Sequence, residues 1–481
     1  MKLSQLLQGV EVLQLHADPQ TEVNAVISDS RKVTPGSLFV AVSGFASDGN
    51  RFIPMAMEKG AVVIVTTKKP EMDVPYVLVA SDRLALAILG TNFFGRPAES
   101  MTMIGVTGTN GKTSTTWLLK QVLQQVKGAK VGLVGTMENH IGDLVLPTER
   151  TTPESIELQE LFAQMRDAGC SYAVMEVSSH ALELERVGGI TFDVAAFTNL
   201  TEDHLDFHKT MEAYCDAKAI LFRRCRRAVV NGDDPWTPRI LDGCMAPVIT
   251  ASLGESGTLR AEDVCLRADG VTFTAIFGEE RAKVDVGIPG KFTVRNVLSV
   301  LGIALQLDIS LQEAAEALSK VEGVKGRVEV VPTPGKEFTV LIDYAHTPDG
   351  LENVLSSVKH FCKGRLIAVF GCGGDRDPIK RPIMGRIGVD LADVAIITSD
   401  NPRTEEPAAI LRDIVAGVGD AKNYEVIENR PNAIKYAMDI AKKDDIIVLA
   451  GKGHETYQEI MGVKHHLDER EVVAEHLAEM R

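Results

Sequence analysis

Apolar residues occur along this chain in two patterns: short continuous runs, and longer stretches in which they recur at helical spacing. In the first hundred residues the runs are short and separated by turn residues, which predicts a small α/β unit. Its expected strands lie at 23–27, 37–42, 62–66 and 76–79. The segment from Asn92 to Pro97 combines glycine with proline, so we place the first domain boundary there and expect the unit to span residues 1–98.

Beyond that boundary, apolar strands alternate with helical patterns as far as residue 325, which predicts a largely parallel sheet with helices on its faces. The expected strands lie at 101–106, 130–134, 172–177, 194–199 and 228–231. Residues 257–286 instead alternate polar and apolar positions around turns at Asp269-Gly270 and Gly278, which predicts antiparallel hairpins appended to that sheet. A third α/β unit is expected at 326–481, with strands at 340–343, 366–370, 394–398 and 446–449.

Composition narrows the class of protein. A length of 481 residues suits about three domains, and the formal charge of −15 argues against nucleic acid as a partner. The chain has no run of about 18 apolar residues and no long apolar core at its N-terminus, so we expect neither a membrane span nor secretion. We therefore expect a cytoplasmic protein. Seven cysteines without a C-x-x-C pair are typical of scattered reduced thiols.

One glycine-rich run carries the strongest chemical signal. It lies between an expected strand and a helix indicated by the apolar positions Leu118, Leu119, Val122, Leu123 and Val126, and it reads Thr107-Gly108-Thr109-Asn110-Gly111-Lys112-Thr113-Ser114. Backbone N–H groups at the start of a helix, together with the Lys112 cation, form a cradle for the phosphates of ATP, and the Thr113 hydroxyl lies where it would bind Mg²⁺. Val106 departs from the usual P-loop pattern, which has glycine there. The alternative is a glycine-rich turn that binds nothing.

Three further residues follow elements of the same expected sheet. Glu176 closes a strand, so its carboxylate is expected at the carboxyl end of the sheet as a Mg²⁺ ligand; a buried acid that only caps the strand is the alternative. His204 lies in the run Asn199 to Asp206, which is rich in oxygen ligands. Lys218 falls on an expected helix, where an ordinary surface lysine is the alternative reading.

The form T-G-T-N-G-K-T resembles the Mur ligases, ATP-dependent enzymes that add amino acids to the peptide of the bacterial cell-wall precursor. The resemblance implies an α/β fold of three domains: a UDP-sugar-binding domain (1–98), a central P-loop-type ATP-binding domain (99–325) and a Rossmann-like amino-acid-binding domain (326–481). It implies that Thr107, Gly108, Thr109, Asn110, Gly111, Lys112 and Thr113 contact the nucleotide. It also implies that Lys112, Glu176, His204 and Lys218 are catalytic, with two Mg²⁺ ions held by Thr113, Glu176, His204 and a carbamylated Lys218.

Other contacts are expected from the same resemblance. Asn296 corresponds to an adenine-side contact near the hinge to the last domain, although Thr293 replaces the second asparagine expected there. Arg327 and Asp343 correspond to residues that reach ATP from the last domain, although Arg327 alone could be a surface turn residue. Contacts to the UDP-N-acetylmuramoyl dipeptide are expected from Ser28, Ser30, Thr151, Thr152, Ser178 and Arg186. The departures at Phe45-Ala46-Ser47 and at Leu184 leave the uracil contacts open.

The run Asp400-Asn401-Pro402-Arg403 further resembles the members of the family that add the third residue, to UDP-N-acetylmuramoyl-L-alanyl-D-glutamate. In that resemblance, arginine at position 403 implies meso-diaminopimelate as the added amino acid. The distal carboxylate of diaminopimelate can accept two hydrogen bonds from a guanidinium, whereas the bare ammonium at the end of lysine would be repelled. Arg376 is implied to hold the carboxylate at the reacting end. Gly451 and Glu455 are implied to bind the distal ammonium.

The implied reaction begins with attack of the acceptor D-glutamate carboxylate on the γ-phosphate of ATP, and the amine then displaces phosphate from the resulting acyl phosphate. We expect a monomer. Three alternatives stay open: the same ligase using L-lysine, a folylpolyglutamate-synthase-like ligase, and a nucleotide-binding protein without catalysis. An assay of ADP release distinguishes these alternatives, because they differ in whether release requires an amino acid and in which amino acid it requires.

Overall fold

The structure is a computed structural model that describes residues 1–44 and 48–480. The chain divides into two compact units, one formed by Met1–Leu259 and Ser299–Ser310, the other by Arg260–Leu298 and Leu311–Arg481. Phe45, Ala46 and Ser47, where the sequence departs from the expected uracil contacts, lie outside the described residues. All seven cysteines are free thiols, as the sequence predicts.

The first unit begins with a five-stranded sheet of order β1-β5-β4-β3-β2. Neighbours β2 to β5 are parallel, and β1, which the sequence analysis did not predict, pairs antiparallel with β5. The strands are β1 Val12–His16, β2 Ala25–Ile27, β3 Ser37–Val40, β4 Val63–Thr66 and β5 Tyr76–Val79. The helices are α1 Leu3–Leu6, η1 Ser30–Lys32, η2 Gly49–Phe52, α2 Ile53–Glu58 and α3 Asp82–Phe93.

The rest of the first unit is built on a larger sheet, ordered β13-β12-β11-β6-β10-β7-β8-β9 within the unit. Its strands are parallel from β13 to β7, whereas β8 and β9 form an antiparallel edge. The strands are β6 Thr102–Thr107, β7 Val131–Val134, β8 Asn139–Ile141, β9 Leu144–Leu146, β10 Tyr172–Glu176, β11 Phe192–Phe197, β12 Cys225–Asn231 and β13 Val248–Ser252. The helices are η3 Pro97–Ser100, α4 Lys112–Lys127, α5 Ser155–Asp167, α6 Ser179–Glu183, α7 Leu205–His208, α8 Met211–Phe222 and α9 Thr237–Ile240.

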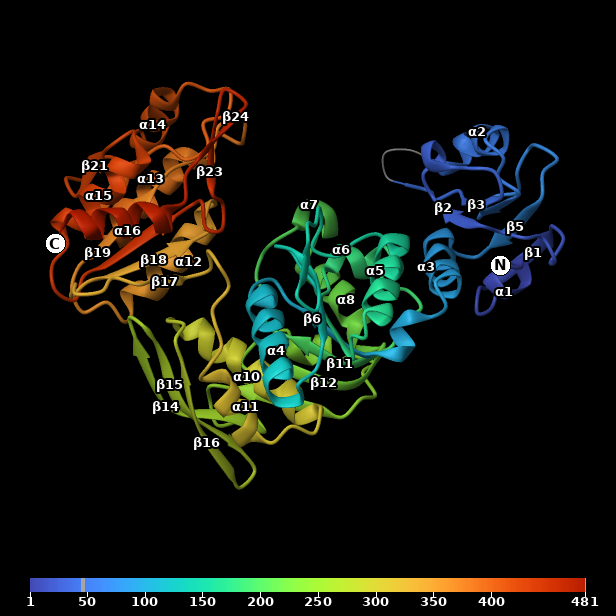
Figure 1. The fold of residues 1–481 in the computed structure, drawn as a ribbon, viewed down its shortest axis with the longest axis horizontal. Helices are drawn as coiled ribbons and strands as arrows, with labels where there is room; N and C mark the ends of the chain where they lie inside the picture. The colour runs from blue at the N-terminus through green and yellow to red at the C-terminus, as the bar shows by residue number, and fades with distance from the viewer. Residues whose placement is uncertain (45–47, 481) are drawn as a thin grey trace. The chain divides into compact units, whose positions relative to one another are not determined.

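Helices lie on both faces of this sheet (Figure 1). Ala173 and Met175 of β10 join a core with Phe162 of α5 and Leu221 of α8. Since side chains alternate along a strand, Glu176 at the end of β10 points to the opposite face, which α4 contacts. The apolar stripe predicted for α4 is confirmed at four of its five positions; the fifth, Val126, is only half-buried.

The second unit contains a six-stranded sheet of order β17-β18-β22-β19-β20-β21, parallel except for β17. Helices α12 to α14 pack on one face and α15 and α16 on the other (Figure 1). The strands are β17 Glu329–Val331, β18 Thr339–Asp343, β19 Leu366–Phe370, β20 Val394–Ile397, β21 Tyr424–Val426 and β22 Ile446–Ala450. The helices are α12 Pro348–Lys359, α13 Lys380–Leu391, α14 Pro407–Val415, α15 Arg430–Ile440 and α16 Glu469–Glu479.

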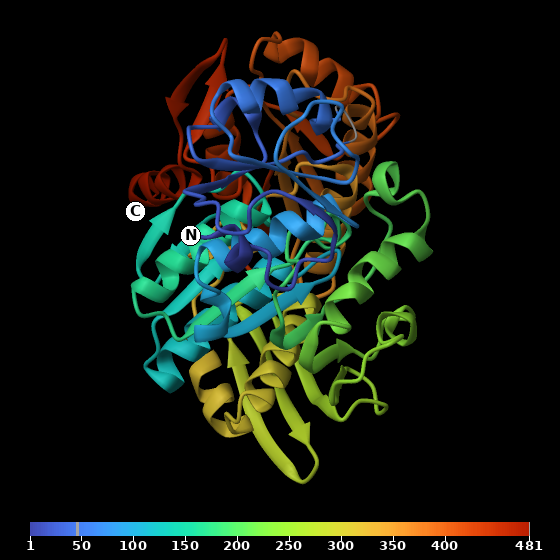
Figure 2. The same ribbon diagram turned by 90° about the vertical axis from the view of Figure 1, so that its right-hand side faces the viewer.

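Antiparallel strands complete the second unit. The strands β15 Gly270–Phe277 and β16 Glu280–Val286 pair from Val271↔Val286 to Phe277↔Glu280, which confirms the predicted hairpin, and β14 spans Leu259–Arg267. A second hairpin, β23 Tyr457–Ile460 and β24 Val463–His466, is the pair of red arrows in Figure 2. The helix α11 spans Leu311–Leu318, and α10, Lys291–Gln306, runs across the division between the units.

The predicted strands are recovered with ends shifted by up to three residues, and the mixed α/β fold with mostly parallel sheets is confirmed. Glu405 and Glu406 precede helix α14 and are not part of it. Helix α14 starts at Pro407, because proline suits the first turn, where its missing N–H has no intrahelical partner; Glu406 is the N-cap.

Candidate active site

The glycine-rich loop joins β6 to α4 as predicted, and two backbone features explain its glycines. Gly111 caps α4 with a φ of 86°, in the left-handed region that glycine adopts without cost. Gly108 has a φ of 146°, and a Cβ there would lie 1.9 Å from Thr198 Oγ1. Only glycine therefore lets the loop pass this close to the end of β11.

Two lysines converge on the carbonyl of Gly108. Lys112 Nζ donates to Gly108 O and to Thr109 O at 2.9 Å each. Lys218, from α8, donates to Gly108 O at 3.0 Å, and its ammonium lies 4.4 Å from the ring centroid of Tyr214. The two side-chain nitrogens thus share one acceptor, the Gly108 carbonyl of the loop.

Lys218 is fully buried, which excludes the ordinary surface lysine considered from the sequence. Burial, reinforced by the positive charge of Lys112, holds the pKa of Lys218 well below its usual value. A neutral amine is nucleophilic, so this environment suits a lysine that reacts with carbon dioxide.

Glu176 lies beside the first turn of α4. Its carboxylate is 1% exposed and accepts hydrogen bonds from Thr113 Oγ1 at 3.0 Å, from the Thr136 amide at 2.9 Å and from Thr136 Oγ1 at 2.9 Å. The structure thus brings Thr113 and Glu176 together, as the sequence predicts. Thr136, which sequence reasoning missed, precedes β8 in a loop without a recognisable motif.

His204 is placed differently. It is half-exposed, has a φ of 55° and caps the short helix α7; its Nε2 lies 3.4 Å from Asp203 Oδ2. Its ring is 4.9 Å from that of His180 and 6.1 Å from that of Tyr214. Tyr214 connects it to Lys218, whereas no contact joins His204 to Glu176 in the part of the chain that the structure describes.

The donor set at this loop fits Mg²⁺ in part. Across residues 1–44 and 48–480 no group of three or more His, Cys, Asp or Glu side chains is arranged to enclose a metal ion. Mg²⁺ does not require such a cage, since it commonly binds one or two carboxylates together with waters and substrate phosphates. The Glu176 carboxylate and the Thr113 hydroxyl, at the N-terminal end of α4, supply that kind of oxygen.

Four of the six residues expected to bind the UDP-N-acetylmuramoyl dipeptide, Thr151, Thr152, Ser178 and Arg186, gather around Glu176. Thr152 Oγ1 donates to Glu176 O at 2.9 Å, and the Ser178 amide donates back to Thr152 Oγ1 at 3.1 Å. Thr151 Oγ1 lies 3.0 Å from Thr136 Oγ1. Arg186 Nη1 donates to Thr152 O at 3.1 Å, and its Nη2 pairs with a glutamate at 2.7 Å. The sequence did not assign that glutamate, Glu154.

Arg186 combines burial with incomplete pairing. Its side chain is 13% exposed, burial lowers its pKa despite the Glu154 carboxylate, and its Nε is buried without a hydrogen-bond partner. Ser28 and Ser30 lie elsewhere in the first unit, where Asp29 caps the single turn η1. Leu184 ends α6 as its C-cap.

In the second unit, Asp343 ends β18 with its carboxylate buried. It accepts hydrogen bonds from the amides of Val328 and Ala345, both at 2.8 Å. Burial raises its pKa, against the opposing charge of Arg327. Arg327 lies over the ring of Tyr344 at 5.2 Å, so it is not a solvent-facing turn residue alone.

Asn296 is buried on α10. Thr293, which stands where a second asparagine was expected, donates to Pro289 O at 2.9 Å. This threonine hydroxyl therefore serves its own helix.

Two loops of the second unit meet around Gly373, between β19 and α13. A Cβ built at Gly373 would lie 2.8 Å from Arg403 Nη1 and 3.9 Å from Arg376 Cγ, so the two arginines flank this glycine. Arg403 Nη1 donates to Gly374 O at 2.7 Å, and Arg403 Nε lies 3.6 Å from Glu459 Oε2. The structure thus brings together the two arginines that the sequence assigned to opposite ends of one amino acid.

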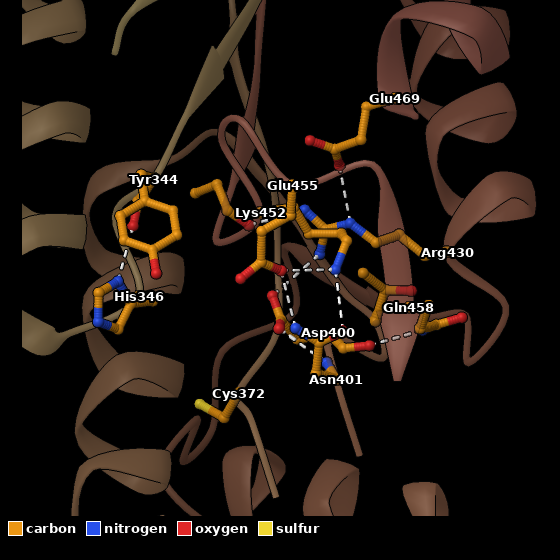
Figure 3. A network of polar contacts seen from close by, with 12 residues as sticks. Tyr344, His346, Cys372, Asp400, Asn401, Arg430, Lys452, Glu455, Gln458 and Glu469 are labelled. Carbon is orange, nitrogen blue, oxygen red and sulfur yellow. Dashed lines mark hydrogen bonds and ion pairs between the residues drawn. The ribbon is translucent and has the colours of Figure 1, made fainter. Parts of the chain in front are cut away.

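A largely buried set of polar residues gathers where β20 and β22 end, around the first residues of α15 and α16 and strand β23. We call it the Asp400 cluster, and it comprises Asp400, Asn401, Arg430, Lys452, Glu455, Gln458 and Glu469 (Figure 3). Asn401 Nδ2 donates to Glu455 Oε2 at 2.8 Å, and Gln458 donates to Asp400 O at 2.6 Å. Pro402 continues the chain from this cluster to Arg403. Gly451 lies against Asp400: a Cβ there would be 2.5 Å from Asp400 Oδ2.

Sequence reasoning missed several members of this cluster. Lys452 lies inside the glycine-rich run that contains Gly451 and Glu455, so its position was a usable signal. Arg430 and Glu469 form a fully buried ion pair with an N–O distance of 2.8 Å, but they belong to different helices and no motif marks them.

Comparison with known proteins defines the class. Three Mur ligase family models match the chain: the Mur ligase family catalytic domain at residues 22–94, the middle domain at 106–304 and the glutamate ligase domain at 326–453. The chain belongs to the Mur ligase family, which confirms the resemblance seen in its motifs.

Individual relatives within the family carry more specific names. The UDP-N-acetylmuramoyl-L-alanyl-D-glutamate–2,6-diaminopimelate ligase 1 of Clostridium acetobutylicum is 48% identical over 484 residues, with 100% of both chains covered. The ligase of the same name from Clostridioides difficile is 44% identical, again with 100% of both covered. A solved structure of such a ligase is 31% identical, with a TM-score of 0.78, covering 100% of this chain and 99% of its own.

More distant structures share the fold alone. MurF from Thermotoga maritima, in complex with ADP, is 19% identical with a TM-score of 0.58, covering 96% of this chain and 99% of its own. A folylpolyglutamate synthase of Mycobacterium tuberculosis is 17% identical with a TM-score of 0.60, covering 83% and 94%. The helices among the described residues include none long and apolar enough to cross a membrane.

Proposed function

We propose that this chain is an ATP-dependent ligase that joins meso-2,6-diaminopimelate to the D-glutamate of UDP-N-acetylmuramoyl-L-alanyl-D-glutamate, a step in making the peptidoglycan precursor. The proposal rests above all on Arg403, whose guanidinium donates to Gly374 O at 2.7 Å and lies against Gly373, the same glycine that Arg376 approaches. A guanidinium matches a carboxylate in charge and in planar geometry, whereas it repels an ammonium. Full-length identity to ligases named for diaminopimelate supports the same substrate.

ATP would bind at the loop from Thr107 to Thr113, where backbone N–H groups and the start of α4 favour phosphate. We assign Lys112 to the phosphates, because exchange of its contacts with Gly108 O and Thr109 O for phosphate oxygens needs only a side-chain rotation. Asn296, Arg327 and Asp343 are the proposed contacts from the second unit.

Thr113, Glu176, His204 and Lys218, the last as a carbamate, are the proposed ligands of two Mg²⁺ ions, which would neutralise phosphate charge when bound. Formation of the carbamate joins the neutral Lys218 amine to carbon dioxide and releases one proton. The buried position and lowered pKa of Lys218 favour the neutral amine that this step needs.

Ser28, Ser30, Thr151, Thr152, Ser178 and Arg186 are the proposed contacts of the acceptor. The unpaired Nε of Arg186 and the neighbouring hydroxyls would orient an anionic group close to Glu176. The acceptor carboxylate then attacks the γ-phosphate and gives an acyl phosphate and ADP. The diaminopimelate amine displaces phosphate and forms the amide, so no enzyme nucleophile is required.

The organisation that we propose has three domains, 1–98 for the UDP-sugar, 99–325 for ATP and 326–481 for the amino acid, in a cytoplasmic monomer. Size-exclusion chromatography with light scattering checks the monomer. Expression of 326–481 alone, followed by thermal unfolding, checks whether that domain folds by itself.

The function is tested by ADP release from the purified protein with ATP, Mg²⁺ and the UDP-muramoyl dipeptide, in parallel with meso-diaminopimelate, with L-lysine and with no amino acid. Release that depends on diaminopimelate is expected. Release with lysine alone would make this the lysine-adding ligase, and release with neither would reject both assignments. Lys112→Ala should abolish release while thermal unfolding stays unchanged.

A further inference from the structure

Lys452 is a charged residue inside the Asp400 cluster to which neither the motifs nor the proposed mechanism gives a role. It follows β22 and its side chain is 0% exposed. Its Nζ donates to Asn401 Oδ1 at 3.0 Å and to Glu455 Oε2 at 3.1 Å (Figure 3). An ammonium is taken fully out of water only where nearby groups compensate the charge, so these contacts account for its burial.

The hydrogen bonds fix the orientation of Glu455. Asn401 Oδ1 also accepts from the Glu459 amide at 2.9 Å, and because a backbone N–H can only donate, the Asn401 oxygen must face it. Asn401 Nδ2 is then the group that donates to Glu455 Oε2, at 2.8 Å. Oε2 thus receives two donors, from Lys452 and Asn401, which matches its two lone pairs and directs Oε1 toward other partners.

The charges of the cluster are unequal. Lys452 and Arg430 supply two cations, whereas Asp400, Glu455 and Glu469 supply three carboxylates. Arg430 Nη1 and Asp400 Oδ2 lie 4.0 Å apart, and each is buried without a hydrogen-bond partner. A cluster with one excess negative charge, and with a buried carboxylate oxygen that accepts no hydrogen bond, favours an incoming cation with several N–H donors, such as a primary ammonium.

We propose that Lys452 is a positioning residue: with Asn401 it holds Glu455 through Oε2, so that Oε1 receives the distal ammonium of the added diamino acid. The inference rests on the function proposed above and extends it to a residue that does not itself touch the substrate. Lys452 and Arg430 neutralise two of the three carboxylates in the cluster. The remaining negative charge is available to a single incoming cation.

The test is a double-mutant cycle between Lys452→Met and Glu455→Gln, read as KM for diaminopimelate and kcat in the ADP-release assay. Methionine keeps the length and removes the charge and the donors. Loss of one charge-assisted hydrogen bond should raise KM for diaminopimelate about 10- to 100-fold. The values of KM for ATP and for the acceptor should change by no more than about twofold, because these substrates bind elsewhere.

In the Glu455→Gln background, Lys452→Met should add less than about threefold to KM for diaminopimelate, since the residue through which Lys452 acts has already been replaced. A matched control is Arg365→Met. It removes an ion pair to Asp445, with an N–O distance of 2.7 Å, in the same unit but before β19, at the opposite end of the sheet. Its KM for diaminopimelate should equal that of the wild type.

An equal increase in KM for diaminopimelate in both backgrounds, or an equal increase in KM for ATP, would reduce Lys452 to a structural role and overturn the inference. If Lys452→Met lacks a cooperative unfolding transition, Lys452→Gln enters the same cycle. Glutamine loses the charge but keeps an N–H donor, so its expected increase in KM for diaminopimelate is smaller, and that increase should again shrink in the Glu455→Gln background. The wild type separates the two proposals. Wild-type enzyme without diaminopimelate-dependent ADP release rejects the proposed function, whereas release with an additive cycle rejects the role of Lys452 alone.

Discussion

Replacement of Arg403 by alanine should convert a ligase selective for diaminopimelate into one that discriminates poorly. Alanine at this position would keep both backbone hydrogen bonds of Arg403. The amide donates to Glu459 O at 3.0 Å, and the carbonyl accepts from the Met461 amide at 2.6 Å. These bonds join the loop to the β23–β24 hairpin whatever the side chain. The φ of 53° at this position strains alanine no more than arginine. The substitution should therefore remove the guanidinium and leave the loop in place.

The size of the expected loss in kcat/KM follows from the burial of Arg403, whose side chain is only 23% exposed. Truncation of one partner of a buried charge pair costs about 2–5 kcal/mol. At about 1.4 kcal/mol for each factor of ten, kcat/KM for diaminopimelate should fall between about 30-fold and about 4,000-fold. The side chain already has Gly374 O and Glu459 as partners, and exchange of these contacts for the ligand favours the lower half of that range. The value of kcat/KM for L-lysine should stay level or rise, because lysine has no distal carboxylate for Arg403 to bind and the cation that repels its ammonium is gone.

The assay is ADP release with diaminopimelate and with L-lysine as separate substrates, and thermal unfolding serves as a check on the fold. Arg376→Ala is the matched control. Arg376 is assigned to the carboxylate that both amino acids carry, so its loss should lower both kcat/KM values by the same factor and leave their ratio unchanged. If Arg403→Ala retains kcat/KM for diaminopimelate within about threefold of the wild type, the assignment of the distal carboxylate to Arg403 is refuted.

The remaining predictions concern the first unit. Gly108→Ala should lower kcat/KM for ATP by at least about 100-fold, because its Cβ would lie 1.9 Å from Thr198 Oγ1 and the loop must shift. The control Gly128→Ala, at the C-cap of α4 with a φ of 57° and nothing within 4 Å of its Cβ, should cost only about 1 kcal/mol in chemical denaturation and leave kcat/KM for ATP unchanged. Equal kcat/KM values for ATP in these two variants would contradict the inference that the close approach at Gly108 is needed for ATP use. Burial, and then the charge of Lys120, lower the pKa of His140 below 6.5. The unfolded chain therefore binds a proton at this histidine more readily than the folded protein, and the free energy of unfolding should fall as the pH drops below about 6.5. Denaturation curves of the wild type and of His140→Gln across this range check the sign, and identical slopes would exclude His140 as the cause.

Most of the fold could be predicted from local pattern. Each strand predicted in the two large sheets is present, because buried parallel strands appear as continuous apolar runs that turn residues separate. The strand β1 was missed because all five of its residues are exposed and its sequence lacks that pattern. The edge strands β8 and β9, three residues each, are too short to give a periodicity.

The candidate site could be predicted wherever a motif carries it. Lys112 and Thr113 follow from the glycine-rich loop, and Glu176 follows from its place at a strand end. Thr136 could not be found, because its amide and hydroxyl reach Glu176 across 40 positions of sequence. The role of such a residue depends on which strands become neighbours.

The sequence by itself determined the order of the elements, the glycine-rich loop between β6 and α4, and the Asp400 to Arg403 run, since each depends on residues close together along the chain. Tertiary structure alone decided which distant charges meet. It buried Lys218 against the Gly108 carbonyl, 110 positions away, and brought Lys452 to Asn401, 51 positions away. The energy of a charge depends on its solvent exposure and on its neighbours, and packing sets both, so these roles become visible only in the folded chain.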